Sequence, residues 1–222
     1  MRRFLKNIIQ LAVLYLYIGL IASADEQQNQ VEIGSFTTGS LANWKNKEFK
    51  GQTGYRLIKI DDLQVLEAES NAAASGLFFE QRIDLQKTPI LNWRWRIEKP
   101  LVNPDEQIKD GDDFAARIYV VVSGGLVFWN TKSINYVWAS TAPKEATWPN
   151  PFAGDHVMMI AVRSTADKIG TWYTEKRNIR ADFKKLMGDA IQYIDAVAIM
   201  TDTDNAKGHA KAYYGDIYFT AD

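Results

Sequence analysis

An alternation of apolar and polar residues, which begins at Leu91 within the segment 90–98, constrains the fold of this chain more than any other feature. Every second position is apolar: Leu91, Trp93, Trp95 and Ile97. The positions between them are polar: Asn92, Arg94, Arg96 and Glu98. Because successive side chains of a β-strand point to opposite faces, the segment is predicted to be a strand with one face in a hydrophobic core. Both tryptophans are expected to be core residues.

The same period of two recurs elsewhere in the chain. Over 113–122, one side carries Phe114, Ala116, Ile118 and Val120, and the other carries Asp113, Ala115, Arg117 and Tyr119. Over 133–139, one side carries Ile134, Tyr136 and Trp138. Further strands are expected near 31–36, 55–60, 63–69, 76–83, 156–163, 170–177, 194–201 and 211–219.

One helix is expected at 179–187, where Asn178 can cap the first turn and Gly188 can end the last. Turn-forming residues separate most of the predicted strands. The repeated helical patterns of a βαβ fold are missing from the sequence. We therefore predict a single all-β domain over 31–222, an antiparallel jelly-roll-like β-sandwich with one short helix.

Residues 1–24 have the order of regions that is typical of a secretory signal peptide. Arg2, Arg3 and Lys6 precede an apolar run, and Ala22-Ser23-Ala24 offers a cleavage site. The apolar run is shorter than the roughly 20 residues of a membrane span, and an uncleaved anchor is the alternative. We expect cleavage to leave a disordered lead-in at 25–30, no stable membrane span, and a periplasmic or secreted protein.

Charge and cysteine content limit the possible partners. Without residues 1–24 the chain has 23 basic and 27 acidic residues, a net charge of −4. Such a chain lacks the positive field that attracts nucleic acid, so no nucleic-acid partner is expected. The sequence contains no cysteine, and an exported protein of this composition must be stable without disulfides.

Arginine and aromatic residues on the predicted strand faces form the first candidate site. If the strand over 90–98 is adjacent to that over 113–122, three guanidinium groups meet on one sheet face, where they suit carboxylate or phosphate. Aromatic rings nearby could stack on a sugar. The predicted ligand-binding residues are Arg94, Arg96, Arg117, Tyr119, Tyr136, Trp138 and Tyr214. The alternative is an internal ion network, in which the arginines pair with Asp112, Asp113, Glu175 or Asp202.

Carboxylates supply two further candidate sites. Asp202 and Asp204 alternate with threonines in a polar loop, a pattern that suits Ca²⁺. A turn in which these side chains bond their own backbone explains the same residues, and no other cofactor is expected. Glycoside hydrolysis requires two carboxylates, and the candidate catalytic pair is Glu175 with Asp113 or Asp202.

Several longer stretches carry a resemblance to known proteins. The opening FTTGSLANW (36–44) and the ending AYYGDIYF (212–219) resemble the galactose-binding-like jelly rolls, which include many carbohydrate-binding modules. A bacterial family of exported proteins, classified only as a domain of unknown function, is similar over about 33–219. Its similarity rests on LNWRWRI (91–97), GDDFAARIYVV (111–121), INYVWA (134–139), W-x-N-P (148–151), EKRNIRADF (175–183), IMTDTDN (199–205) and AYYGDI (212–217). The resemblance implies a β-sandwich, and it implies no activity and no catalytic residue.

Three functions are compatible with this sequence. The leading hypothesis is an exported, non-catalytic protein that binds a carbohydrate or similar envelope polymer, with an anionic polymer as one option. The second is a polysaccharide hydrolase or lyase. The third is a structural or assembly factor of the envelope with no small ligand, whose protein partner the sequence does not identify.

Overall fold

The computed structural model describes residues 30–102, 105–125 and 130–222. The predicted signal peptide (1–24) and residues 25–29 of the predicted lead-in lie outside these ranges. Gln30, the last residue of that lead-in, begins the first strand. Among the residues that the structure describes, no helix has the length and apolar character needed to cross a membrane.

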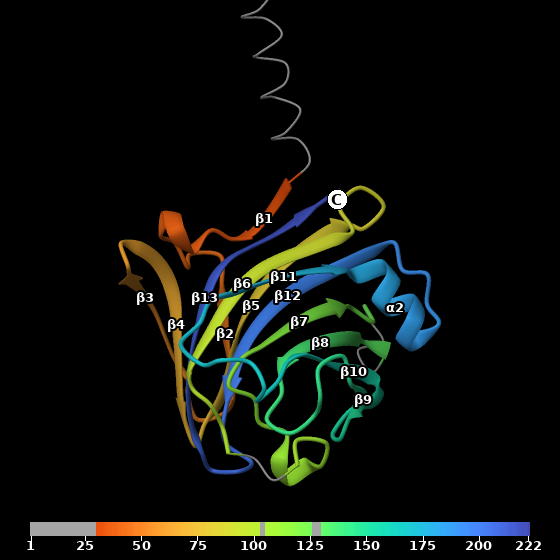
Figure 1. Ribbon diagram of the computed structural model, residues 1–222. Coiled ribbons are helices and arrows are strands. Elements are labelled where there is room, and N and C mark those ends of the chain that lie inside the picture. Colours follow the sequence, from red (N-terminus) through yellow and green to blue (C-terminus); the bar gives the residue numbers. More distant parts are fainter. Residues whose placement is uncertain (1–29, 103–104, 126–129) are drawn as a thin grey trace, which may run out of the picture.

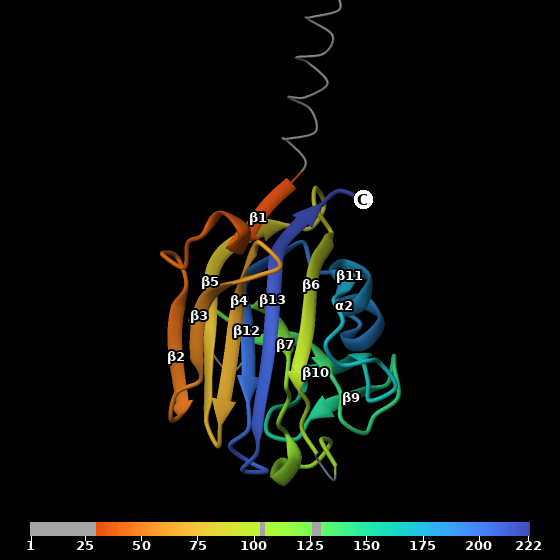
Figure 2. The same ribbon diagram turned by 60° about the vertical axis from the view of Figure 1, so that its left-hand side comes forward.

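Two β-sheets pack against each other (Figure 1). Sheet A has the order β11-β6-β13-β4-β3, and β1 also pairs with β13. Its strands are β1 (Gln30–Gly34), β3 (Gly54–Ile60), β4 (Leu63–Asn71), β6 (Ile90–Lys99), β11 (Tyr173–Asn178) and β13 (His209–Thr220). Figure 2 shows β3, β4, β13 and β6 side by side, with β12 and β7 of the other sheet beyond them.

Sheet B has the order β2-β5-β12-β7-β8-β10-β9. Its strands are β2 (Lys45–Lys50), β5 (Ala74–Asp84), β7 (Arg117–Val122), β8 (Lys132–Trp138), β9 (Thr147–Asn150), β10 (Gly154–Arg163) and β12 (Tyr193–Asp202). Short 3-10 turns occupy Phe36–Thr38 (η1) and Lys109–Gly111 (η2). The predicted all-β sandwich is confirmed. Among the described strands, one pair, β8 with β10, is parallel, and the others are antiparallel.

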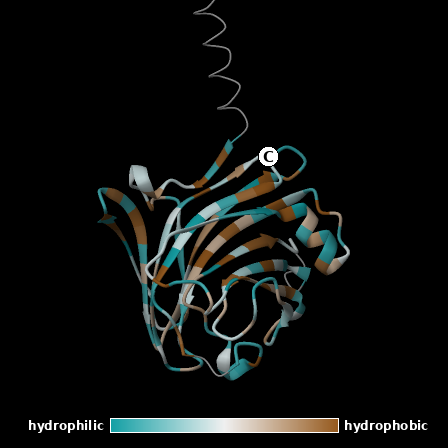
Figure 3. Ribbon diagram, viewed as in Figure 1, coloured by the Kyte–Doolittle hydropathy of each residue, from teal (hydrophilic) through white to brown (hydrophobic). Residues whose placement is uncertain are grey.

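The hydrophobic core lies between the sheets, where the predicted alternation places it. On β6, the four apolar residues are at most 2% exposed: Leu91, Trp93, Trp95 and Ile97. Their neighbours Arg94 and Arg96 point out of the sandwich and are partly exposed. Figure 3 shows hydrophobic and hydrophilic residues alternating along such strands. The prediction that Trp93 and Trp95 are core residues is confirmed, and their rings meet edge to face.

The one described α-helix, α2 (Ile179–Met187), has the predicted bounds and caps. The side chain of Asn178 accepts a hydrogen bond from the backbone N–H of Ala181 at 2.9 Å. Gly188 adopts a left-handed conformation (φ 71°) and donates its N–H to the carbonyl of Lys184. Such an N-cap typically contributes about 1 kcal/mol. Ile179 and Phe183 are buried and fix the helix at the edge of the sandwich, beside β11 (Figure 1).

A second, smaller hydrophobic cluster lies on the outer side of sheet B. Phe114 was predicted to share a face with Ala116, Ile118 and Val120, but this was wrong. β7 begins only at Arg117, and the chain before it carries Phe114 into the second cluster, against Trp148. This cluster covers one end of the outer face of sheet B and leaves the rest open.

Candidate functional site

A groove with a volume of about 580 Å³ crosses the open part of the outer face of sheet B. Its lining extends from the edge strand β2, across β5, β12, β7 and β8, to β10 and the turn between β9 and β10. From β2 to β10 this path crosses five strand-to-strand spacings of about 4.8 Å, or about 24 Å in all. The groove therefore suits an extended ligand.

Aromatic side chains occupy both sides of this groove. Phe49 on β2 is 54% exposed, and Phe152 in the β9–β10 turn is 57% exposed. Phe78 and Tyr119 line the groove between them and are partly buried. Each exposed phenylalanine also has a lysine ammonium near its ring: Lys47 lies 5.2 Å from the centre of Phe49, and Lys109 lies 5.5 Å from that of Phe152. Phe49 also packs against Phe78, with the ring centres 6.5 Å apart, and about half of each of the two exposed phenylalanines stays accessible to a ligand.

Arg117 and two carboxylates form the floor of the groove at one end. Its Nη2 donates to Oδ2 of Asp202 at 2.5 Å, and its Nη1 lies 3.8 Å from Oδ1 of Asp112. The guanidinium also lies near the rings of Phe114 and Tyr119, at 5.2 and 5.1 Å. Arg117 is only 4% exposed. Arg117 therefore belongs to an internal ion network, which was the alternative to a ligand-binding role. Carboxylates of the protein itself balance its charge.

Burial makes this end of the groove electrostatically unusual. Burial raises the pKa of Asp112 above its ordinary value, although the guanidinium of Arg117 opposes that shift. Burial also raises the pKa of Asp202, again against the attraction of Arg117, and repulsion from Asp113 and Asp112 adds to the shift. A carboxylate that loses contact with water is costly to ionise, so this cluster favours proton or cation uptake.

The three arginines of the predicted cluster do not meet. Arg94 and Arg96 lie on β6 in sheet A and Arg117 lies on β7 in sheet B, so they point out of opposite faces of the sandwich. Arg94 lies against the ring of Trp172, 5.0 Å from its centre, and Arg96 pairs with Glu98 at 2.6 Å. Alternation shows which residues share a strand face, but it does not show which sheet a strand joins.

Three predicted ligand-binding aromatics are buried between the sheets. Tyr136 and Tyr214 are 0% exposed and Trp138 is 3% exposed. Tyr136 donates its hydroxyl to Asp182 at 2.8 Å, and Trp138 donates its indole N–H to the carbonyl of Ser164. The hydroxyl of Tyr214 lies 3.0 Å from the carbonyl of Met200. As platforms for a ligand these three predictions were wrong. Tyr119 does line the groove, and its role as a ligand contact stays a prediction.

The predicted catalytic pair is not assembled either. Glu175 lies on β11 in sheet A, where it accepts the indole N–H of Trp95 and pairs with Arg163 at 2.6 Å. Asp113 instead accepts the backbone N–H groups of Asn205 and Ala206. Asp202 pairs with Arg117 on the other sheet. Glu175 is therefore engaged in a buried ion pair away from the groove.

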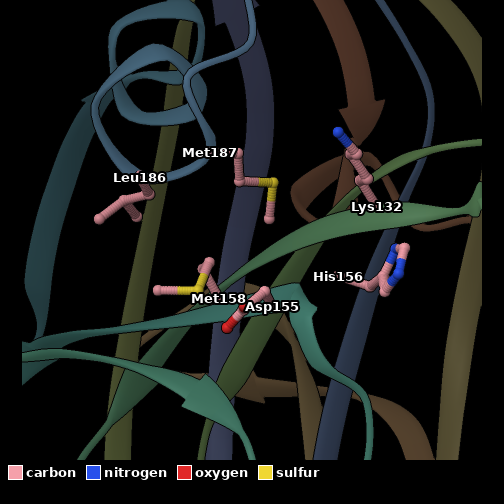
Figure 4. Close-up of a pocket in the computed structure, with 6 residues that line it drawn as sticks. All are labelled: Lys132, Asp155, His156, Met158, Leu186 and Met187. Atoms are coloured by element: carbon pink, nitrogen blue, oxygen red, sulfur yellow. The ribbon is translucent and has the colours of Figure 1, made fainter.

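A second hollow, of about 510 Å³, lies between the last turn of α2 and the start of β10 (Figure 4). Its lining is Lys132, Asp155, His156, Met158, Leu186 and Met187. Figure 4 shows the side chains of Met158 and Met187 facing this space from the strand and the helix. Among the described residues that line it, none is Phe, Tyr or Trp. The groove on sheet B is thus the better candidate for an extended ligand.

Sequence reasoning missed the three phenylalanines of the groove. Phe49 stands in KNKEFK, where all the remaining residues are polar. Phe152 follows Pro149-Asn150-Pro151. A large aromatic residue in a wholly polar strand or in a turn has no core to enter, and that was the available signal.

Comparison with solved structures finds the same fold in a carbohydrate-binding module. A family 30 carbohydrate-binding module of a cellulosomal cellulase of Clostridium thermocellum has a TM-score of 0.51 and 11% identity; the match covers 87% of this chain and 98% of that one. A family 28 module, described as specific for non-crystalline cellulose, has a TM-score of 0.48 and 12% identity, over 86% and 95% of the two chains. At such identity the first likeness shows the fold alone.

Comparison of the sequence gives a more specific result. No curated protein matches the chain. A family profile described as "Protein of unknown function (DUF3047)" matches residues 42–218, which include all the described strands except β1 and the last two residues of β13. The match thus agrees with the predicted resemblance to an uncharacterised family, and the chain belongs to the DUF3047 family.

Proposed function

We propose that this protein is an exported, non-catalytic carbohydrate-binding protein that holds an extended glycan in the groove on sheet B. The observation that carries the proposal is the pair of exposed phenylalanines, Phe49 and Phe152, on opposite sides of that groove. An aromatic ring without a polar tip can stack on the apolar face of a pyranose. The fold shared with a carbohydrate-binding module supports this proposal, and the predicted signal peptide supports export.

The charges of the groove favour a neutral glycan over a polyanion. Its lining includes two basic residues, Lys47 and Arg117, and three acidic ones, Asp112, Asp202 and Asp204. Arg117 is already paired with a carboxylate, so it has no free charge for a ligand. The anionic option is therefore not part of the proposal.

A glycan array that contains neutral β-glucans, uronic-acid polymers and peptidoglycan fragments tests the proposal. We expect binding to neutral, extended glycans that changes little with salt. Phe49→Ala and Phe152→Ala should each weaken affinity about fivefold to tenfold, because an aromatic contact contributes about 1 kcal/mol beyond its buried area. Both positions are exposed, so the variants should stay folded, and circular dichroism and thermal melting check this.

Trp172→Ala and Arg96→Ala are the matched controls, because both residues lie on the outer side of sheet A. Unchanged binding in these controls, together with weaker binding in both phenylalanine variants, supports the groove. Binding lost in Arg96→Ala and kept in both phenylalanine variants would place the ligand on sheet A instead. An array without any hit, obtained with folded protein, would count against carbohydrate binding and favour an assembly factor.

A further inference from the structure

Three carboxylates meet at the end of the groove where two loops join. Asp113 precedes β7, Asp202 ends β12, and Asp204 lies in the turn that follows β12. One oxygen from each of these residues lies within 4.8 Å of the others. Oxygen ligands of one Ca²⁺ lie 2.3–2.6 Å from the ion, so three oxygens at this separation can share a single ion. Asp113, which precedes Asp202 by 89 residues in the sequence, thus joins the two predicted ligands Asp202 and Asp204.

The cluster retains negative charge after its contacts with basic residues are counted. Asp112, Asp113 and Asp202 are at most 5% exposed. Two basic residues contact the cluster: Arg117 pairs with Asp202, and Lys50 lies 3.5 Å from Asp204. If all four carboxylates are ionised, the two cations leave a net charge of −2. An unbalanced buried charge is costly, and a divalent cation would cancel it.

An unpartnered buried oxygen at the same place is a separate sign of a missing ligand. Oδ1 of Asp112 has no hydrogen-bond partner among the described residues, and the side chain of Asp112 is 7% exposed. This oxygen lies 3.8 Å from Nη1 of Arg117, whose Nη2 bonds to Asp202. Nη1 of Arg117 has no hydrogen-bond partner among the described residues either. Buried polar atoms normally have a partner, and a bound ion or water usually supplies it where the protein does not.

The carboxylates also keep free coordination sites. Oδ2 of Asp113 accepts one hydrogen bond, from Ala206, and Oδ1 of Asp202 accepts one, from the N–H of Phe114. A carboxylate oxygen has two lone pairs, so each of these atoms can still bind a cation. The same hydrogen bonds hold the two loops together, which fixes the ligands before the cation arrives.

We propose that Asp113, Asp202 and Asp204 bind one Ca²⁺ ion at the end of the groove, with Asp112 beside it and water completing the coordination. Hard oxygen ligands with several carboxylates favour Ca²⁺ over softer metals. With three protein carboxylates, an affinity of about 0.1–1 mM is expected, the range of extracellular calcium modules. The ion would join the loop before β7 to the loop between β12 and β13. The proposal does not depend on glycan binding.

Isothermal titration of the purified protein with CaCl₂, after removal of metal with a chelator, tests the site. We expect one saturable binding event and, at ten times Kd, a rise in Tm of about 3–6 °C. MgCl₂ should give a weaker effect, and NaCl at the same ionic strength should give none. The glycan is left out, so the result is independent of the proposed function.

Asp204→Asn is the main variant, because Asp204 is partly exposed and the protein should fold without its charge. It should weaken Ca²⁺ binding at least tenfold. Asp110→Asn, an exposed residue of η2 outside the cluster, is the matched control and should leave binding unchanged. A titration without saturable heat up to 10 mM would overturn the proposal, as would equal affinity in Asp204→Asn and the unaltered protein. In either case protons, rather than a metal ion, neutralise the cluster.

Discussion

Replacement of Glu175 by glutamine separates a structural role of this carboxylate from a catalytic one. Glu175 is 6% exposed, accepts the indole N–H of Trp95 at 3.0 Å, and contacts Arg163 at 2.6 and 3.2 Å. Glu175→Gln removes the charge from the ion pair and keeps an acceptor for Trp95. Removal of one partner of a buried ion pair typically costs about 3–5 kcal/mol.

The expected cost here lies at or below the lower end of that range. Arg163 is 14% exposed and keeps a second partner, Asp167, at 3.0 Å. We therefore expect the free energy of unfolding to fall by about 2–3 kcal/mol. Urea denaturation, followed by tryptophan fluorescence, measures this loss. The urea concentration at the midpoint should fall, and the dependence of the unfolding free energy on urea should not change. At urea concentrations too low to unfold the variant, Glu175→Gln should bind glycan with the same affinity as the unaltered protein.

A double-mutant cycle with Arg163→Met provides the control. If the ion pair is the source of the effect, the cost of Glu175→Gln should shrink in the Arg163→Met background. A loss below about 1 kcal/mol, or costs that simply add, would show that the ion pair contributes little and refute this reasoning. Turnover of a polysaccharide that disappears in folded Glu175→Gln would instead restore the hydrolase hypothesis.

Two further predictions concern the outer face of sheet A. Hydrogen bonds from Lys211 and His209 lower the pKa of Glu69, so its contribution to stability is present above its unfolded pKa and is lost as pH falls through its folded pKa. Thermal melts should therefore show Glu69→Gln less stable than the unaltered protein at pH 7, with the difference disappearing at acidic pH; a difference independent of pH would contradict this. A Cβ at residue 215 would lie 2.2 Å from Nε of Arg94, so Gly215→Ala should lower Tm. Adding Arg94→Ala to that variant should restore Tm, because it removes the clash. If Tm is not restored, the backbone at residue 215 is the cause instead.

The sequence predicted those parts of the fold that depend on local patterns. The alternation on β6 identified a strand and its buried face, and Asn178 and Gly188 identified the bounds of α2. Two edge strands were missed. β2 has no buried side chain, so it has no alternation to detect, and β9 contains Pro149, a residue type more typical of turns than of strands. An edge strand places few side chains in the core, so packing requires fewer apolar residues at fixed positions in its sequence.

The candidate site was less predictable, because it depends on which strands become neighbours. Asp113 and Asp202 come together only through the pairing of β12 with β7 and the loops that follow from it. The same topology separates Arg96 from Arg117, although both lie on the polar faces of regular strands. Periodicity carries no information about pairing over such distances along the chain.

The position of β13 has a consequence for how this protein is made. β13 is the last of the described strands in sequence order, yet it lies in the interior of sheet A, between β6 and β4, and also pairs with β1. A growing polypeptide therefore cannot complete this sheet until residues 209–220 have emerged. Fragments that stop before residue 209 leave the inner edges of β6 and β4 bare, and open strand edges invite aggregation. Synthesis should yield either the whole domain or a substrate for proteolysis, with no stable half-domain between them.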